Sequence, residues 1–275
     1  MKCGEIKHLF KLIKDNNPLV HHITNQVTIN DCANVTLAIG ASPVMADYTR
    51  EVEEIVSKAD ALLLNLGTFN EERYQSMKVA GKKANQLGIP IVFDPVGVGA
   101  SSFRKNKALE LLKEIDICII RGNYAEVSSL VGLGGKAKGV DSVNLEESSN
   151  DVIKIAKLVA TAFDSIVVIS GEIDVVTNGQ RACIVENGDE WLSKISGTGC
   201  ASGSLIASFS AVTNDYYLAA VAGISTMGVC GERAKKALEK ADGLGTYRVK
   251  LMDQLSSMDG DTWGREVRIY EVEYG

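Results

Sequence analysis

Ile89-Pro90-Ile91-Val92-Phe93 is followed directly by the polar turn Asp94-Pro95-Val96-Gly97, and this stretch decides the class of fold. Its first part is short and almost entirely apolar. Three further runs share that character, and they cover Ala61–Leu66, Asp116–Ile120 and Ser165–Ile169. Continuous apolar runs of this length are typical of strands that are buried on both faces, as in a parallel sheet.

Amphipathic stretches of helical length separate these runs. Asn70 and Gly88 bound one of them, because asparagine is a good N-cap and glycine readily ends a helix. Residues 103–114 and 149–163 predict two more helices. Alternation of strands and helices at this spacing predicts βαβ units, and therefore a three-layer α/β/α sandwich with a mostly parallel central sheet.

The alternation ends at residues 174–185, where Asn178-Gly179 lies between two β-prone runs and predicts an antiparallel hairpin. Residues 199–257 predict three helices, and Val267–Val272 has the alternation of an extended edge segment. No linker or repeat interrupts the 275 residues, so we expect a single domain over 1–275.

Composition argues against several classes of partner. The net charge is -6 and no basic run occurs, so we expect neither nucleic acid nor a membrane as a partner. The N-terminal stretch lacks the apolar centre of a signal peptide, and the six cysteines form no CxxC pair. We therefore expect a reduced, cytoplasmic protein, and the histidines (His8, His21 and His22) give a zinc cluster little support.

The loop Ser196-Gly197-Thr198-Gly199-Cys200 precedes an apolar stretch of helical length. Its glycines allow a tight turn and a close approach to a ligand, and the N-terminus of a helix attracts anions. Gly197, Thr198, Gly199 and Cys200 therefore predict an anion hole, in which a thiolate or alkoxide would be stabilised. A tight turn before a core helix is the structural alternative.

Polar residues follow the predicted strands at their carboxyl ends, where open parallel sheets bind ligands. Asp94 follows one strand, and Arg121 and Glu126 follow the next. Each has a structural alternative: a turn at Asp94-Pro95, a surface charge at Arg121, and a capping box that ends at Glu126. If the strands are neighbours, these three residues share one rim with Cys200.

An anion hole, an arginine and two carboxylates fit phosphoryl transfer, which needs positioning and charge neutralisation more than covalent help. Mg²⁺ prefers carboxylates, phosphate oxygens and water, so Asp94 and Glu126 could hold it. Other motifs fail, because Gly97-Val98-Gly99 lacks the third glycine of a dinucleotide fingerprint and residues 132–136 do not complete a Walker A loop.

Several stretches together resemble the hydroxyethylthiazole kinase family of the ribokinase-like superfamily, over almost the whole chain. They are HHITNQVTINDCANVTLAIGASPVMAD, ALLLNLGT, VFDPVGVGAS, IIRGNYAEVSSL and SGTGCASGSL. The resemblance implies a ribokinase-like sandwich without a lid domain, and a homotrimer with active sites between subunits. It also implies phosphorylation of the primary alcohol of 4-methyl-5-(2-hydroxyethyl)thiazole in thiamine biosynthesis, with ATP as co-substrate and Mg²⁺ as cofactor.

By position, the resemblance implies that Arg121 and Ser170 contact ATP and that Asp94 and Glu126 serve the magnesium ion. Cys200 stands where the superfamily usually has an aspartate. A free thiol has a pKa near ~8.5, so it is a poor base at neutral pH unless the helix end lowers that value. We expect Cys200 to position and partly deprotonate the alcohol, without becoming a covalent nucleophile.

The resemblance also implies contacts with the thiazole from Met45, Gly197 and Asn25. Gly67 and Thr68 would contact it from the neighbouring subunit. The structural alternative for Gly67-Thr68 is a simple turn after a strand.

Three alternatives stay open. A kinase with the same fold could act on another small alcohol, such as a pyrimidine or a sugar. A cysteine hydrolase could use Cys200 with His21 or His22, although it would leave Asp94 and Arg121 unused. A non-catalytic regulator would bind nucleotide without turning it over, and ADP release distinguishes these cases.

Overall fold

Strands from the whole length of the described chain join in one sheet. The structure is a computed structural model, and it describes residues 3–132 and 149–272. Within these residues the strand order is β2-β1-β3-β4-β5-β6-β7-β8-β9. The strands are β1 (Leu19–Ile23), β2 (Ser42–Met45), β3 (Ala61–Asn65), β4 (Ile91–Asp94), β5 (Ile119–Asn123), β6 (Ile166–Ser170), β7 (Asp174–Thr177), β8 (Ala182–Val185) and β9 (Ile269–Val272).

Neighbours from β2 to β6 pair in parallel, whereas β7, β8 and β9 each pair antiparallel to the preceding strand. This confirms the predicted, mostly parallel sheet. The apolar runs predicted as strands contain β3, most of β4, most of β6 and the first two residues of β5, and these strands are largely buried. The strand predicted over 116–120 therefore begins and ends three residues later than expected. The alternating C-terminal segment contains β9 at the edge of the sheet.

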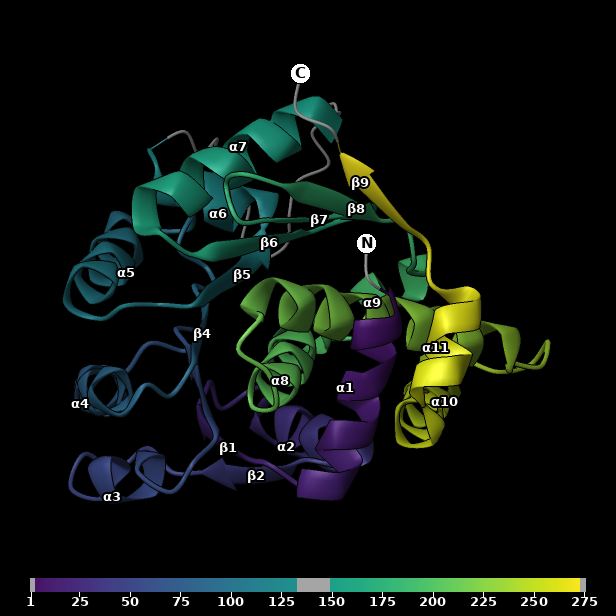
Figure 1. Ribbon diagram of the computed structural model, residues 1–275, viewed down its shortest axis with the longest axis horizontal. Helices are drawn as coiled ribbons and strands as arrows, with labels where there is room; N and C mark the ends of the chain where they lie inside the picture. The colour runs from purple at the N-terminus through teal and green to yellow at the C-terminus, as the bar shows by residue number, and fades with distance from the viewer. Residues whose placement is uncertain (1–2, 133–148, 273–275) are drawn as a thin grey trace.

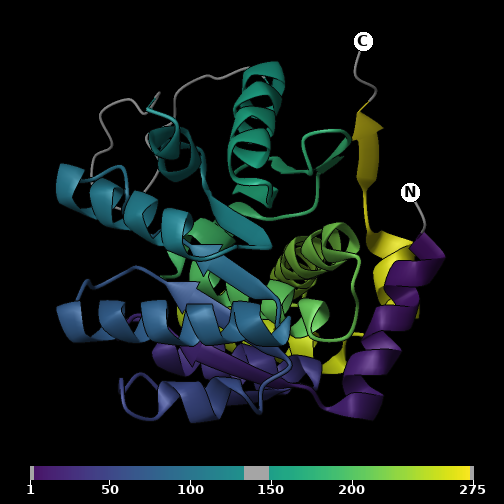
Figure 2. The same cartoon turned by 60° about the vertical axis from the view of Figure 1, so that its left-hand side comes forward.

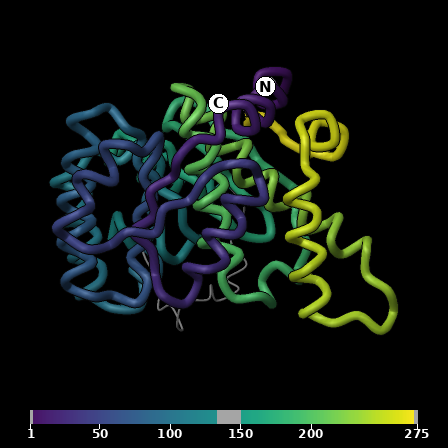
Figure 3. The backbone as a smooth tube through the Cα atoms, turned by 90° about the horizontal axis from the view of Figure 1, so that it is seen from below, coloured from purple at the N-terminus to yellow at the C-terminus, as the bar shows by residue number. Residues whose placement is uncertain are grey.

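Helices cover both faces of the sheet and complete three layers (Figure 1). One face carries α3 (Val52–Val56), α4 (Glu71–Leu87), α5 (Ser102–Glu114), α6 (Tyr124–Leu130) and α7 (Ser149–Phe163). The other carries α1 (Cys3–Asn16), α2 (Ile29–Ile39), α8 (Thr198–Ser210), α9 (Tyr216–Lys236), α10 (Leu244–Ser257) and α11 (Gly260–Glu266). Figure 2 shows α3, α4 and α5 stacked along the first face, and Figure 3 places α10 and α11 at the opposite side of the molecule.

Two hydrophobic cores lie on the two faces, and alternate residues of each strand belong to different cores. In β3, Leu62 and Leu64 pack with α3 and α4, whereas Leu63 packs with the helices of the second face. This alternation explains why the strand sequences are continuously apolar, because both faces of the strand are covered.

The predicted helix boundaries are confirmed. The Asn70 side chain accepts the N–H of Arg73 at the start of α4, and Gly88 ends the helix with φ +70°. Residues 199–257 contain most of α8 together with α9 and α10, as predicted, and α11 follows them. None of the helices within residues 3–132 and 149–272 is long and apolar enough to cross a membrane.

The predicted hairpin joins β7 and β8 through a loop over residues 178–181. Asn178 Oδ1 accepts the N–H groups of Gln180 and Arg181, and Gly179 has φ +85°. After β8 the chain runs through the 3₁₀ helix η1 (Glu190–Lys194) to the start of α8. The N-terminus of α8 is thereby placed at the carboxyl ends of the parallel strands.

Candidate active site

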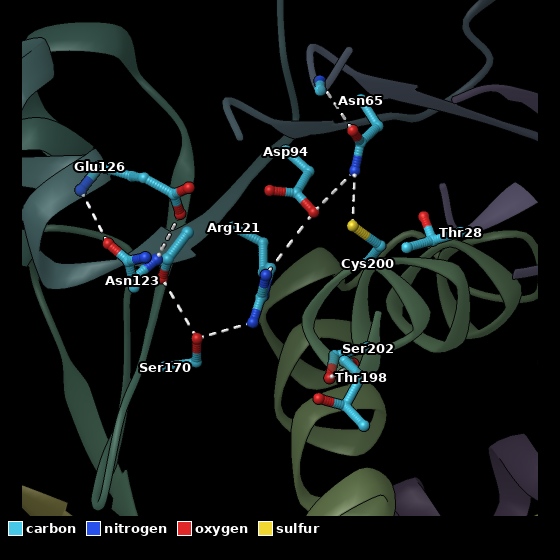
Figure 4. Close-up of polar contacts among 12 residues, drawn as sticks. Thr28, Asn65, Asp94, Arg121, Asn123, Glu126, Ser170, Thr198, Cys200 and Ser202 are labelled. Atoms are coloured by element: carbon cyan, nitrogen blue, oxygen red, sulfur yellow. Dashed lines mark hydrogen bonds and ion pairs between the residues drawn. The ribbon is translucent and has the colours of Figure 1, made fainter. Parts of the chain in front are cut away.

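The strand order brings the carboxyl ends of β3, β4, β5 and β6 together. Asn65 and Asp94 end neighbouring strands as register partners, and Asn123 and Ser170 end the next pair in the same way. Because parallel strands end at the same edge, the residues predicted to share one rim do so (Figure 4).

Arg121 connects this rim to α8. The NH2 group of its guanidinium donates to Ser170 Oγ at 2.7 Å, and NH1 lies 3.6 Å from Asp94 Oδ2. The same guanidinium lies against the first turn of α8, where a Cβ added at Gly199 would be 2.9 Å from NH1. Arg121 is 7% exposed, so its interpretation as a surface charge is wrong.

Asp94 is completely buried. Its Oδ2 accepts the Nδ2–H of Asn65 at 3.0 Å, whereas Oδ1 has no hydrogen-bond partner among the described residues. Burial raises the pKa of Asp94 above its usual value, and the charge of Arg121 opposes this shift. A buried carboxylate oxygen without a partner is suited to an additional ligand.

Glu126 forms the capping box that the sequence offered as its structural alternative. Its Oε2 accepts the N–H of Asn123 at 2.9 Å, and Asn123 Oδ1 accepts the N–H of Glu126. Oε1 accepts the N–H of Gly97 at 2.8 Å, and burial raises the pKa of Glu126. The carboxylate keeps further lone pairs, so capping and an additional ligand are compatible.

These two carboxylates fit a magnesium ion as partial ligands. The unbonded oxygen of Asp94 is the observation that supports the fit. In the described part of the chain, no group of three or more histidine, cysteine, aspartate or glutamate side chains could hold a metal. Mg²⁺ usually keeps water and phosphate oxygens as ligands, so two protein carboxylates are enough.

The N-terminus of α8 has no side-chain cap. Gly197 is its N-cap with φ +96°, and a Cβ there would lie 2.8 Å from Thr28 Cγ2. Helix geometry leaves the N–H groups of the first turn without intrahelical partners. The Thr198 hydroxyl does not compensate, because it donates to the Leu192 carbonyl at 2.8 Å. The loop is a tight turn at an uncapped helix N-terminus, and the anion hole stays a prediction.

Cys200 lies in this first turn and is 9% exposed. Its Sγ accepts the Nδ2–H of Asn65 at 3.2 Å and the Nδ2–H of Asn25 at 3.4 Å (Figure 4). Burial and the nearby Asp94 carboxylate raise the pKa of Cys200. The effects of burial and of Asp94 on the thiol pKa are thus larger than the opposite effect of the helix N-terminus. The expected role of Cys200 in deprotonating the alcohol stays a prediction.

Asn65 was missed by the sequence reasoning. It is completely buried, and it bonds to both Asp94 and Cys200. The sequence contained an indication, because Asn65 interrupts the apolar run Ala61–Leu66 at the carboxyl end of a strand.

The residues assigned to the thiazole lie along the same edge. Met45 ends β2 and is the register partner of His22 in β1. A Cβ at Gly67 would lie 3.0 Å from the Asn25 Cβ, and Thr68 Oγ1 accepts the N–H of Gln26. Gly67 and Thr68 thus lie beside Asn25 of the same chain, and a contact with the site of a second subunit stays a prediction.

Both histidines of β1 are buried. His21 Nε2 lies 2.7 Å from the Ala46 carbonyl oxygen, and His22 Nε2 lies 3.2 Å from Ser204 Oγ. Burial lowers the pKa of His22 to about 4. Among the hydrogen bonds of residues 3–132 and 149–272, neither imidazole bonds to Cys200, so the pairs that a cysteine hydrolase would need are not formed.

The three-layer α/β/α sandwich with its mostly parallel sheet places the chain in the class of ribokinase-like folds. A solved structure of the pyridoxal kinase from Staphylococcus aureus in complex with pyridoxal shares this fold. Its TM-score is 0.62 at 17% identity, over 92% of this chain and 98% of that chain.

Closer similarities identify the family. The profile of the hydroxyethylthiazole kinase family matches residues 10–261. A hydroxyethylthiazole kinase from Ruminiclostridium cellulolyticum is 43% identical over 268 residues, which are 98% of each chain. The structure of the hydroxyethylthiazole kinase protein from Pyrococcus horikoshii OT3 has a TM-score of 0.87 at 36% identity, over 98% of this chain and 100% of that chain. The chain belongs to the hydroxyethylthiazole kinase family and is a kinase.

Proposed function

We propose that this kinase transfers the γ-phosphoryl group of ATP, with Mg²⁺, to the primary alcohol of 4-methyl-5-(2-hydroxyethyl)thiazole in thiamine biosynthesis. It acts as a single kinase domain over residues 1–275 and assembles as a homotrimer with active sites between subunits. The observation that carries the proposal is the uncapped N-terminus of α8. Its first turn contains Cys200 and lies against Arg121, which forms an ion pair with Asp94.

On the donor side, the N–H groups of Thr198, Gly199 and Cys200 take up the charge on the phosphoryl oxygens. Arg121 adds a positive charge beside them and is oriented by Ser170. Phosphoryl transfer passes through a loose transition state, so positioned charge is the main contribution that the protein can make. Asp94 and Glu126 would hold Mg²⁺, which neutralises phosphate charge when bound.

On the acceptor side, Met45, Asn25 and Gly197 contact the thiazole, together with Gly67 and Thr68. Cys200 orients the hydroxyl group that attacks. Its pKa is raised by burial, so the thiol keeps its proton at neutral pH. In a loose transition state the nucleophile keeps its proton until late, so orientation matters more than base strength.

The fold does not select the acceptor, because the pyridoxal kinase shares it. A kinase of another small alcohol is therefore the main competitor. The positions of the histidines argue against the cysteine hydrolase. No contact in the described residues favours a non-catalytic regulator over a kinase.

A coupled ADP-release assay tests the proposal. Purified protein with ATP and Mg²⁺ is offered hydroxyethylthiazole, pyridoxal, a hydroxymethylpyrimidine and ribose in separate reactions. We expect kcat/KM for the thiazole alcohol to exceed the others by at least about 10²-fold, and chelation by EDTA to abolish turnover until Mg²⁺ is restored. A preference for another acceptor would show that the proposed substrate is wrong. Equal ADP release without any alcohol would refute the kinase reaction. Light scattering during gel filtration tests the homotrimer.

A further inference from the structure

The side-chain amide of Asn65 makes every hydrogen bond that an amide of this kind readily makes. Its Oδ1 accepts the N–H of Gly67 at 3.0 Å and the Nδ2–H of Asn25 at 3.0 Å. Its Nδ2 donates to Asp94 Oδ2 at 3.0 Å and to Cys200 Sγ at 3.2 Å. Two donors and two acceptor positions are the full capacity of the group.

Backbone groups fix the orientation of this amide. The Gly67 N–H can bond only to an acceptor, so the oxygen of Asn65 must face Gly67 and its nitrogen must face Asp94 and Cys200. Asn25 is fixed in the same way, because its Oδ1 accepts the N–H groups of Val27 and Thr28. Asn25 Nδ2 therefore also faces Cys200, and the sulfur receives one N–H from each asparagine.

The position of Asn65 in the sheet gives it this reach. In β3, residues 61, 63 and 65 lie on the face of the sheet that α8 covers. A Cβ at Gly203 of α8 would lie 3.4 Å from Leu63 Cδ1. Another leucine at position 65 would continue that apolar row. An asparagine in the row instead meets Asp94 of the next strand and Cys200 of the helix.

We propose that Asn65 is a positioning residue whose amide holds Asp94, on the phosphate side of the site, and Cys200, on the acceptor side, in a fixed relative arrangement. This inference rests on the proposed function, because that function places Asp94 beside the phosphoryl donor and Cys200 beside the acceptor alcohol. Two amide donors on the sulfur also leave the S–H bond no room on that side.

A double-mutant cycle tests this role. Asn65→Asp keeps the shape of the side chain but replaces both N–H donors by an oxygen that faces Asp94 and Cys200. A misplacement of about 1 Å costs about 10²-fold in rate, so we expect kcat to fall by about that factor. In a Cys200→Ala background the same substitution should cost about tenfold or less, because one of the two groups that it positions is already gone.

Binding separates positioning from structural damage. The affinity for a non-hydrolysable ATP analogue, measured by calorimetry, and the KM for ATP should each change by less than about threefold. Asn85→Asp is the matched control, since the Asn85 amide bridges the backbone N–H and C=O of Asp116 at the other end of the strands. It should leave kcat unchanged.

Equal losses from Asn65→Asp in both backgrounds would overturn the inference, as would unchanged turnover. If Asn65→Asp does not fold, Asn65→Ser removes the same amide without adding a charge, and the same coupling with Cys200 is expected. Turnover of the thiazole alcohol by the unmodified enzyme tests the proposed function separately. If a different alcohol is the substrate, the cycle is measured with that alcohol.

Discussion

The neighbouring helices α8 and α9 pack against each other and bury most of their residues, yet they begin in opposite ways. At the start of α9, the Asp215 side chain accepts the N–H of Leu218 at 3.1 Å. At the start of α8, Gly197 provides no side chain at all. A missing cap costs about 1 kcal/mol of helix stability. A carboxylate therefore caps α9, whereas α8 has no side-chain cap, and the uncapped N-terminus of α8 lies at the rim of the candidate site.

Gly197→Ala has the largest expected effect, because it changes the uncapped helix end itself. A Cβ at φ +96° would lie 2.8 Å from Thr28 Cγ2, so the first turn of α8 would have to move. We expect kcat/KM to fall by about 10³-fold, because the N–H groups would no longer be aimed at the phosphoryl oxygens. Steady-state ADP release measures the effect.

Gly88→Ala is the control for backbone strain. Gly88 also has positive φ, at +70°, but a Cβ there meets no atom within 4 Å. We expect unchanged turnover and a loss of about 1 kcal/mol in the free energy of unfolding. Full activity in Gly197→Ala would exclude the end of α8 as the anion site.

Substitutions of Cys200 sharpen the comparison, because they separate the contribution of the thiol from that of the N–H groups of the first turn. Cys200→Ala should lower kcat by about 10²-fold, and Cys200→Asp should stay active. Since burial and Asp94 raise the pKa of the thiol, it stays protonated as the pH rises from 6 to 8. The ratio of unmodified to Cys200→Ala kcat should therefore be constant over that range.

A ratio that rises about tenfold per pH unit would instead identify a thiolate base. Complete loss of activity in both variants, with a phosphocysteine detected by mass spectrometry in the unmodified enzyme, would identify a covalent nucleophile.

The smallest effect is expected at the capped N-terminus of α9. Asp215→Ala removes the cap of α9 and should lower the free energy of unfolding by about 1 kcal/mol while leaving kcat unchanged. Asp215→Asn keeps a side-chain oxygen that can accept the Leu218 N–H, and it should retain most of the stability. It also removes the exposed ion pair between Arg181 and Asp215, at 3.7 Å, which contributes little. Chemical denaturation measures all three proteins, and a large loss of turnover in Asp215→Ala would remove the contrast between the helices.

The sheet was predictable because its signals are local. Runs such as Ile89–Phe93 are apolar on both faces, and Asn70 and Gly88 mark the ends of α4 through their own backbone preferences. The rim was predictable in part, because carboxyl ends of parallel strands meet wherever the strands are neighbours. Asp94 and Arg121 could be placed in this way.

Asn65 and the ionisation of Cys200 were not predictable in the same way. The four bonds of the Asn65 amide come from groups in three other segments of the chain and from one nearby backbone N–H. The pKa of Cys200 depends on burial and on Asp94, which is more than 100 positions away in sequence. A helix N-terminus favours a thiolate by itself, and in this site the opposing effect of burial is larger.

The sequence by itself determined most of the strands, the bounds of α4, α5 and α7, the turn at Gly197 and the family, because these follow from short stretches of the chain. Tertiary structure decided which polar groups face each other at the rim, and in which direction burial shifts their pKa values. Contact and burial depend on segments that meet only after folding, so the direction of the pKa shift of Cys200 could not be read from its neighbours in the sequence.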